Sequence, residues 1–268
     1  MIVGILSASI IANNSISLPD LNNLMLVIIF GFLNISAAIL LNQYTDADVD
    51  RVNKPYRAIP SGKIKPKNML IFSIILYLLG IGLALYLGVI YLLLSAISIF
   101  VGFSYSFKCF HVRDSIVASM VLLAFGYVIW AFIVGWAIYK PISVIPWWFI
   151  GVLLMADSAE ALVKDYRDIS GDKEGGITTL PIKMGYQRAA KLNFIVYSIP
   201  FLLLIFAFLF GILNFKFALM GALCLLMIIL AFYRLIKRQK RDDALLAYRI
   251  VTLNYFITRI LGAWAFLH

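Results

Sequence analysis

The sequence predicts an all-α, polytopic membrane protein with nine transmembrane helices around a central cavity. Its 268 residues are 63% hydrophobic and only 13% charged, and the mean hydropathy of +0.97 is far too high for a soluble domain of this length. Only two cysteines occur, Cys109 and Cys224, and the second lies in a predicted span. The composition therefore excludes a soluble enzyme, and a disulfide framework is not expected.

Nine segments are long enough to cross a bilayer core of about 30 Å. We place them at about residues 1–18, 20–50, 67–88, 89–107, 115–138, 144–168, 187–210, 215–236 and 244–267. Related polar motifs end the second and the sixth segments, which suggests two four-helix halves, 1–107 and 115–236, followed by a ninth helix. We treat residues 1–268 as one membrane-embedded domain.

The net charge of +10 comes mainly from Lys and Arg in four stretches, at 51–67, 108–113, 164–191 and 234–249. All four stretches follow an even number of predicted spans, so the positive-inside rule places them on the cytoplasmic side of the cell membrane. The N-terminus is then inside and the C-terminus outside. Membrane topology accounts for this charge, and we expect no nucleic-acid partner.

Polar residues abruptly follow the apolar second segment, in the run NQYTDADVDRVNKPYRAIPSGK at 42–63. Asn42, Asp46 and Asp50 are spaced by four residues, and at about 100° per residue they fall within roughly 80° of one helix face. Asp48 lies about 120° from Asn42 on the same wheel and is expected outside this stripe. The spacing predicts one polar stripe at the membrane end of a helix.

Three cations, Lys54, Arg57 and Lys63, follow this stripe where prolines and a glycine must break the helix. Hard oxygen ligands beside flexible cations suit a phosphate compound bound through Mg²⁺. The stretch therefore predicts a magnesium and phosphate site.

A second acidic stripe occurs at the end of the sixth segment, in the run KDYRDISGDKEGGITTLPIKMG. Its three carboxylates are spaced three and four residues apart and fall within roughly 60° on a helix wheel. We expect the catalytic carboxylates to be Asp46, Asp50, Asp168 and Asp172, and the metal ligands to be Asn42, Asp46, Asp50, Asp165, Asp168 and Asp172. An even number of spans separates the two stripes, so both should face the central cavity from the cytoplasmic side.

Ionisable residues also occur inside the sixth segment, where they are rare and face a bundle interior or a wet cavity. Glu160 and Lys164 have the acid-first spacing of an intrahelical ion pair, which is an alternative to a substrate contact for Lys164. Asp157 has no cation nearby in the sequence. We expect it to pair with Arg259 of the last segment.

The two motifs resemble the signatures of the UbiA superfamily of intramembrane prenyltransferases, and the resemblance extends over nearly the whole chain. The first signature is matched by Asn-x3-Asp-x3-Asp, then Asn53-Lys54-Pro55-x-Arg57 and Pro60-Ser61-Gly62, and the second by Asp165, Asp168 and Asp172 with Thr179-Leu180-Pro181. Two positions differ from the usual pattern, with Gln43 in place of Asp and Ala58 in place of Pro. The first difference implies one fewer acidic contact at the metal site.

The resemblance implies Mg²⁺ as cofactor, an isoprenyl diphosphate as donor, and either a lipid-like alcohol or an aromatic ring as acceptor. Tyr105 and Lys108 match a Tyr and a Lys of the family, and Arg113 follows closely. The implied substrate contacts are Asn42, Lys54, Arg57, Lys63, Tyr105, Lys108, Arg113 and Lys164. Membrane lipids are the remaining partners.

The acceptor is indicated by the run KDYRDISGDKEGG and the ending IVTLNYFITRILGAW, which most resemble archaeal family members that form ether bonds in membrane lipids. This resemblance implies transfer of a geranylgeranyl group to geranylgeranylglyceryl phosphate, with prenylation of an aromatic ring in quinone-type biosynthesis as the alternative. A membrane transporter is the alternative from another class. Transporter sites lie near the bilayer midplane, whereas these acids cluster at one membrane face.

The predicted topology is testable by labelling single cysteines from either side of the membrane. Cysteines at Lys65, Lys183 and Lys240 should react from the cytoplasmic side, and a cysteine at Asn214 should react from the opposite side. Opposite accessibility of Lys65 and Lys183 would separate the two acidic motifs and rule out a shared site.

Overall fold

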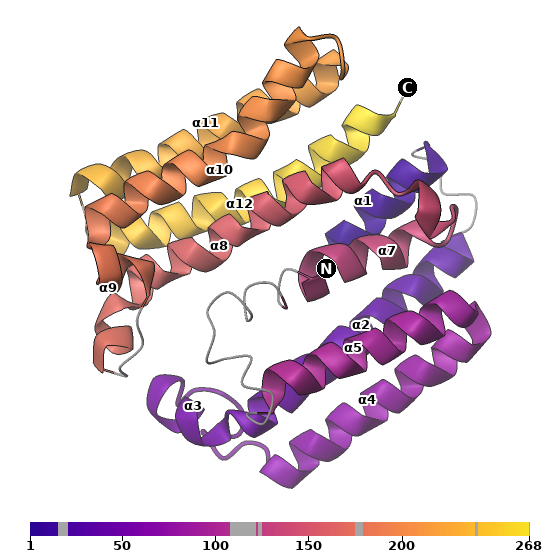
Figure 1. Cartoon of the computed structure of the whole chain (residues 1–268). Coiled ribbons are helices and arrows are strands. Elements are labelled where there is room, and N and C mark those ends of the chain that lie inside the picture. The colour runs from indigo at the N-terminus through magenta and orange to yellow at the C-terminus, as the bar shows by residue number, and fades with distance from the viewer. Residues whose placement is uncertain (16–20, 108–121, 123–124, 175–178, 239–240, 268) are drawn as a thin grey trace. The chain divides into compact units, whose positions relative to one another are not determined.

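The computed structural model describes residues 1–15, 21–107, 122, 125–174, 179–238 and 241–267, with the side chains of a few helical residues excepted. All regular elements in these ranges are helical (Figure 1). The chain divides into two compact units, Met1–Ile145 and Pro146–His268. Each unit is described by itself.

The first unit contains α1 (Ile2–Asn13), α2 (Leu21–Thr45), the short α3 (Ala47–Asn53), α4 (Pro66–Leu87), α5 (Val89–Ser106), a π-helix at Phe125–Trp130, α7 (Ala131–Trp136) and a 3₁₀ turn at Ile142–Val144. Helix α2 packs along both α4 and α5, and α1 packs against α7 (Figure 1). Gly88, with a φ of 113°, is the only residue between α4 and α5. Glycine adopts this conformation readily, which allows the chain to reverse so tightly.

The second unit contains α8 (Trp147–Glu174), the short α9 (Leu180–Met184), α10 (Tyr186–Leu209), α11 (Phe215–Arg238) and α12 (Arg241–Phe266). Helix α11 packs against α10 and α12, and α12 also packs along α8 (Figure 1). Helix α8 has 28 residues and is longer than the predicted sixth segment. The second acidic stripe is therefore part of the helix.

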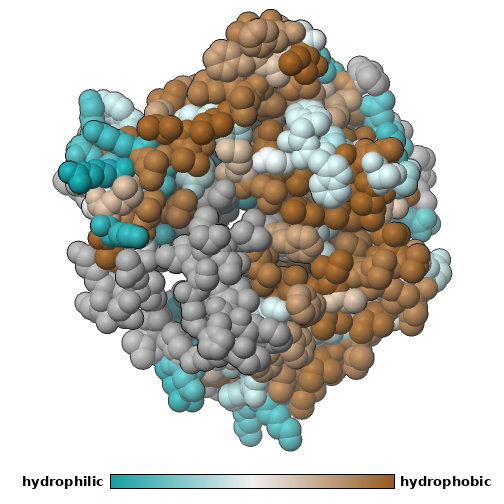
Figure 2. Space-filling view, viewed as in Figure 1, coloured by the Kyte–Doolittle hydropathy of each residue, from teal (hydrophilic) through white to brown (hydrophobic). Residues whose placement is uncertain are grey.

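Six of the described helices are long and apolar enough to cross a membrane: α2, α4, α5, α10, α11 and α12. Figure 2 shows apolar side chains over much of the visible surface, as a protein surrounded by lipid requires. The prediction of nine spans is confirmed only to this extent. Its first segment is a helix of 12 residues, and part of its fifth lies outside the described residues.

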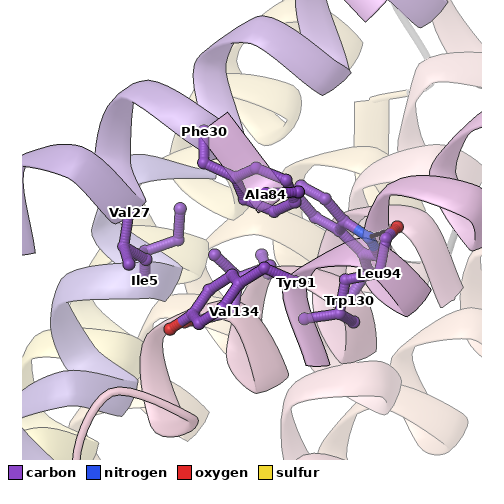
Figure 3. Close-up of a cluster of buried hydrophobic side chains, with 9 residues drawn as sticks. Ile5, Val27, Phe30, Ala84, Tyr91, Leu94, Trp130 and Val134 are labelled. Carbon is purple, nitrogen blue, oxygen red and sulfur yellow. Dashed lines mark hydrogen bonds between the residues drawn. The ribbon is translucent and has the colours of Figure 1, made fainter. Parts of the chain in front are cut away.

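An apolar core connects the helices of the first unit. Phe30 of α2 stacks on Trp130 at 5.7 Å between ring centroids and meets the edge of Tyr91 at 5.4 Å (Figure 3). A side chain at Gly135 would collide with the backbone of Ile5, and Ser9 donates a hydrogen bond of 3.0 Å to the Gly135 carbonyl. Small residues allow such close helix contacts in membranes, where the packing of the backbones contributes most of the attraction.

A buried polar contact joins α2 to α5. Asn34 is fully buried; its amide donates to the Phe30 carbonyl at 3.0 Å, and its carbonyl oxygen accepts from Ser95 Oγ at 3.0 Å. Both ends of the amide thus have partners, which is what an apolar environment requires.

The expected pairing of Asp157 with Arg259 is confirmed within the second unit. The guanidinium donates two hydrogen bonds to the carboxylate, Nη1 to Oδ1 at 3.0 Å and Nη2 to Oδ2 at 2.7 Å. Arg259 is only 1% exposed, donates also to the Tyr255 carbonyl at 3.1 Å, and lies 3.6 Å from the centroid of the Tyr255 ring. This bidentate pair joins α8 to α12.

Removal of the cation should destabilise the protein strongly, because it leaves the Asp157 carboxylate buried without its partner. We expect Arg259→Met to lower the free energy of unfolding by about 3–5 kcal/mol, seen as a lower midpoint of thermal unfolding in detergent. The double variant Arg259→Met with Asp157→Leu should recover most of the loss. Arg249→Met is the matched control, since Arg249 is exposed on the same helix. Equal midpoints for the two single variants would contradict a stabilising role for the pair.

Candidate functional site

The first acidic stripe lies where α2 passes into α3. Helix α2 ends at Thr45 and α3 begins at Ala47, yet backbone hydrogen bonds continue across the junction from Asp46 N to the Asn42 carbonyl at 3.0 Å and from Asp50 N to the Asp46 carbonyl at 2.8 Å. This ladder keeps the helical spacing of four residues through the break. Asn42, Asp46 and Asp50 therefore follow one another along one side of the chain.

Asp48 lies off this stripe, as its position on the helix wheel indicated. Its side chain is 90% exposed and contacts Arg51 at 3.2 Å. An exposed pair of this kind contributes little to stability, so Asp48 provides a reference carboxylate in the same short helix.

The Asp50 carboxylate is buried, with only 4% of its side chain exposed, and two cations approach it. Arg57 Nη1 donates a short hydrogen bond to Asp50 Oδ2, and Lys54 Nζ lies 3.9 Å from Oδ1. A carboxylate withdrawn from water needs such partners. The pair brings two of the cations predicted for phosphate binding to the acidic stripe.

The loop after α3 folds back, so that the Arg57 side chain contacts Asp50. Arg57 N donates to the Lys54 carbonyl at 3.0 Å, and Ser61 N donates to the Arg57 carbonyl at 2.9 Å. Gly62, at a φ of 75°, turns the chain toward Pro66, the first residue of α4. The prolines and the glycine of the motif thus produce a compact turn that carries Arg57.

A cavity of about 290 Å³ opens beside this stripe, within the first unit. Its walls come from α2, α5, the π-helix and the residue Leu122, together with Arg57 from the loop. The lining residues are Ile35, Ala38, Ile39, Asn42, Gln43, Arg57, Ser98, Val101, Gly102, Tyr105, Ser106, Leu122, Gly126 and Trp130. The polar side chains of this lining are Asn42, Gln43, Arg57, Ser98, Tyr105 and Ser106, and the other lining residues are apolar.

Two buried polar atoms of the cavity-lining residues have no hydrogen-bond partner among the described residues: Asn42 Nδ2 and Ser106 Oγ. Both can donate a hydrogen bond, and buried donors are rarely left unpaired in folded proteins. Both atoms belong to residues that line the same cavity as Arg57, and donors together with a cation suit an oxygen-rich, negatively charged ligand.

Sequence reasoning missed Ser106 and Trp130, and it noted Gln43 only as a departure from the family pattern. Ser106 follows Tyr105, which was predicted, but α5 also contains Ser95, Ser98 and Ser104, and the sequence offered no signal to separate them. Only the packing of α5 against α2 shows that Ser98 and Ser106 line the cavity.

The second acidic stripe lies on α8, in the second unit. Asp165 is half-buried and Lys164 is exposed, while the side chains of Asp168, Asp172 and Glu160 lie outside the described part of the chain. The neighbouring Tyr166 is buried and accepts a hydrogen bond of 2.9 Å from Asn193 Nδ2. This contact holds the stripe-bearing part of α8 against α10.

The other predicted contacts differ in their placement. Tyr105 is half-buried and lines the cavity, as does Arg57. Lys63 is exposed in the loop and is not one of the cavity-lining residues. Lys108 and Arg113 lie outside the described residues.

The donor set of the first stripe fits magnesium chemically. Mg²⁺ prefers oxygen ligands and often binds through one or two carboxylates together with substrate phosphates, which Asp46 and Asp50 can provide. The Asn42 carbonyl oxygen is a third candidate, although the buried, unpartnered atom of this side chain is its nitrogen, which donates and cannot ligate. In the described part of the chain, no group of three or more His, Cys, Asp and Glu residues is arranged to hold a metal by itself, so substrate oxygens would have to complete the site.

Comparison with known proteins finds relatives in sequence and in fold. A digeranylgeranylglyceryl phosphate synthase of Pyrococcus abyssi is 33% identical over 196 residues, which are 72% of this chain and 66% of that relative, just under two thirds of its length. The fold matches a structure described as giving insights into the biosynthesis of digeranylgeranylglyceryl phosphate synthase in membranes, with a TM-score of 0.74 and 22% identity over 99% of this chain and 92% of the other.

A second fold match is a UbiA homolog from Archaeoglobus fulgidus bound to GPP and Mg²⁺, with a TM-score of 0.67 and 16% identity over 97% of this chain and 95% of the other. Residues 1–257 match the sequence profile described as the UbiA prenyltransferase family. That match covers nearly the whole chain, including both acidic stripes. The chain therefore belongs to the UbiA prenyltransferase family.

Proposed function

We propose that this membrane protein transfers a geranylgeranyl group from its diphosphate to geranylgeranylglyceryl phosphate and so forms an ether bond of archaeal membrane lipids. One observation carries the proposal: one cavity is lined by Arg57 and by two residues with buried, unpaired donors, and most of its other side chains are apolar. A prenyl diphosphate has the same division into an anionic head and an apolar tail. The P. abyssi relative, named for the product of this reaction, supports the choice of acceptor.

The diphosphate head would bind at the polar side chains of the cavity. Arg57 provides a guanidinium that matches phosphate oxygens in two-point contacts, and Lys54 adds a flexible ammonium group. Asn42 Nδ2 and Ser106 Oγ would then gain the acceptor atoms that they lack within the described chain. Arg57 is paired with Asp50 in this structure. To contact the substrate, Arg57 must either bind the substrate and Asp50 at the same time or leave Asp50.

Magnesium would be held by Asp46 and Asp50 in the first unit, and Asp165, Asp168 and Asp172 are the corresponding ligands that we propose in the second. When bound, the ion supplies neutralisation of the diphosphate charge, which makes the diphosphate a better leaving group. The A. fulgidus homolog, bound to GPP and Mg²⁺, supports a divalent metal. If Arg57 moves from Asp50 to the diphosphate, the oxygens of the Asp50 carboxylate become available to the ion.

In the reaction, the allylic carbon–oxygen bond breaks and its electron pair leaves with the diphosphate. The hydroxyl oxygen of the acceptor forms the new carbon–oxygen bond and loses its proton, which the released diphosphate can accept. Positive charge develops on the allylic group before attack, and the apolar walls keep water from capturing it. Tyr105 lines the cavity next in sequence to Ser106, and its ring face can stabilise that charge by about 1 kcal/mol or more where water is excluded.

The metal site is tested by removing one carboxylate at a time. Asp46→Ala and Asp168→Ala should each abolish turnover while the protein still inserts into membranes, and EDTA should reproduce the loss in the wild type, with recovery on addition of Mg²⁺. Asp48→Ala is the matched control, because it removes an exposed carboxylate from the same short helix and should leave the rate unchanged. Full activity of either stripe variant would remove the core of the proposal.

The acceptor is tested by offering geranylgeranyl diphosphate with either geranylgeranylglyceryl phosphate or 4-hydroxybenzoate and identifying the products by mass. We expect the diether phosphate as the product. An alcohol suffices here, because attack on an already cationic allylic group demands correct positioning and loss of a proton. Efficient prenylation of the ring without diether would refute the acceptor and leave prenyl transfer standing.

A further inference from the structure

The cavity meets the buried Asp50 ion pair through Arg57. Arg57 is one of the cavity-lining residues, whereas Asp50 and Lys54 are not. The side chain of Asp50 is only 4% exposed, while that of Arg57, which donates a hydrogen bond to Asp50 Oδ2, is 28% exposed. A carboxylate that we expect to bind metal is therefore occupied by a cation that a ligand in the cavity can reach.

Asp50 cannot bind Arg57 and a divalent ion equally well at the same time. An ion at this carboxylate would lie close to the guanidinium, and like charges repel strongly where water is largely excluded. The ammonium group of Lys54, with Nζ at 3.9 Å from Oδ1, adds to this repulsion. Conversely, a buried carboxylate is costly to leave without a cation. Asp50 thus has two alternative partners, Arg57 or the ion.

Arg57 can leave Asp50 by a movement of its side chain alone. Its backbone N donates to the Lys54 carbonyl at 3.0 Å, and its carbonyl accepts from Ser61 N at 2.9 Å, so main-chain atoms alone hold its place in the loop. A guanidinium that leaves a carboxylate needs another anion, and diphosphate oxygens match its planar fork in two-point contacts. With a diphosphate in the cavity, Arg57 keeps an anionic partner and Asp50 becomes available to metal.

We propose that Arg57 closes Asp50 to metal in the ligand-free protein, and that a prenyl diphosphate opens it by drawing Arg57 away. The inference rests on the proposed function, since it takes the ligand to be a prenyl diphosphate bound together with a divalent ion. The diphosphate and the ion then bind cooperatively, and each raises the affinity for the other by the same factor, as thermodynamic linkage requires.

The first experiment measures dissociation constants for geranylgeranyl diphosphate in EDTA, by isothermal titration calorimetry in detergent. Without metal, Asp50 only competes with the diphosphate for Arg57. Asp50→Asn should therefore tighten binding by about tenfold, a factor typical of coupled sites, because a neutral amide accepts a weaker hydrogen bond from a guanidinium than a carboxylate does. In an Arg57→Gln background the same substitution should have no such effect, since no guanidinium remains to be released.

Asp48→Asn is the matched control for this experiment. It removes the same charge from the same short helix, but its side chain is 90% exposed and pairs with Arg51. A general effect of charge on diphosphate binding would appear in this variant too, and it would persist in the Arg57→Gln background. A cooperative thermal unfolding transition in detergent verifies that each variant is folded.

The second experiment measures the binding of Mn²⁺ in the absence of diphosphate, from the loss of the electron paramagnetic resonance signal of the free ion. Mn²⁺ prefers the same oxygen ligands and octahedral geometry as Mg²⁺. Arg57→Gln should tighten Mn²⁺ binding by about tenfold, because it removes the competing cation from Asp50. Arg51→Gln, which removes a cation from the exposed pair on the same helix, should leave the affinity unchanged. This measurement does not depend on the folding of Asp50→Asn.

The outcomes separate the inference from the proposed function. If the folded wild type does not bind geranylgeranyl diphosphate with Mg²⁺ present, the proposed function fails, and the inference fails with it. If it binds, but Asp50→Asn tightens metal-free binding no more than Asp48→Asn does, or equally in the Arg57→Gln background, the inference is wrong while the proposed function stands. A Mn²⁺ affinity that Arg57→Gln leaves unchanged would also overturn it. Both increases in affinity, each absent from its control, support the inference.

Discussion

A carboxylate that is withdrawn from water must find a cation, and both units of this protein depend on that requirement. In the first unit, Arg57 and Lys54 approach the buried Asp50, which ties the loop after α3 back to the acidic stripe. In the second unit, Arg259 holds Asp157 with two hydrogen bonds and joins α12 to α8. Removing one partner of such a pair costs far more than the pair itself contributes, so these contacts define how the helices are oriented.

The two pairs nevertheless differ in a way that matters for function. Arg259 is almost completely buried, with further contacts to Tyr255, so its pair with Asp157 is suited to a permanent structural role. The side chain of Arg57 is 28% exposed, and it lines the cavity. A partly open guanidinium in a cavity with unpaired donors can exchange partners when an anion enters. The buried pair of Arg259 with Asp157 thus resembles a structural ion pair, and the partly exposed pair of Arg57 with Asp50 resembles one at a binding site.

Buried polar atoms without a hydrogen-bond partner also distinguish a structural residue from one at a binding site. Asn34 sits in the middle of an apolar bundle with both ends of its amide bonded. Asn42, two turns further along α2, has a buried amide nitrogen without a partner in the described chain. The same residue type on the same helix therefore serves packing in one case and belongs to the cavity lining in the other. The difference lies in what the neighbouring helices provide.

Local patterns in the sequence were sufficient for the helical membrane class and for the acidic stripe. Six described helices have the length and hydropathy of spans, and the four-residue spacing of Asn42, Asp46 and Asp50 persists as backbone hydrogen bonds. The pairing of Asp157 with Arg259 was also predictable, because few partners exist for a carboxylate among apolar segments. Such features follow from periodicity and from the cost of burying charge, and both can be read along one chain.

The cavity was decided by tertiary structure alone. Ser106 and Trp130 come from segments that the sequence did not mark as functional at these positions, and they line one space with Asn42 only because α5 and the π-helix pack against α2. Ala38, Gly102 and Gly126 are small residues of its lining, and Trp130, another lining residue, is held by the Leu94 carbonyl and the Phe30 ring. The sequence by itself determined the membrane class, the stripe and the buried ion pair, since these depend on local spacing and polarity. The lining of the cavity depends on side chains from three helices that are far apart in the sequence. A local sequence pattern cannot predict which of these side chains come together.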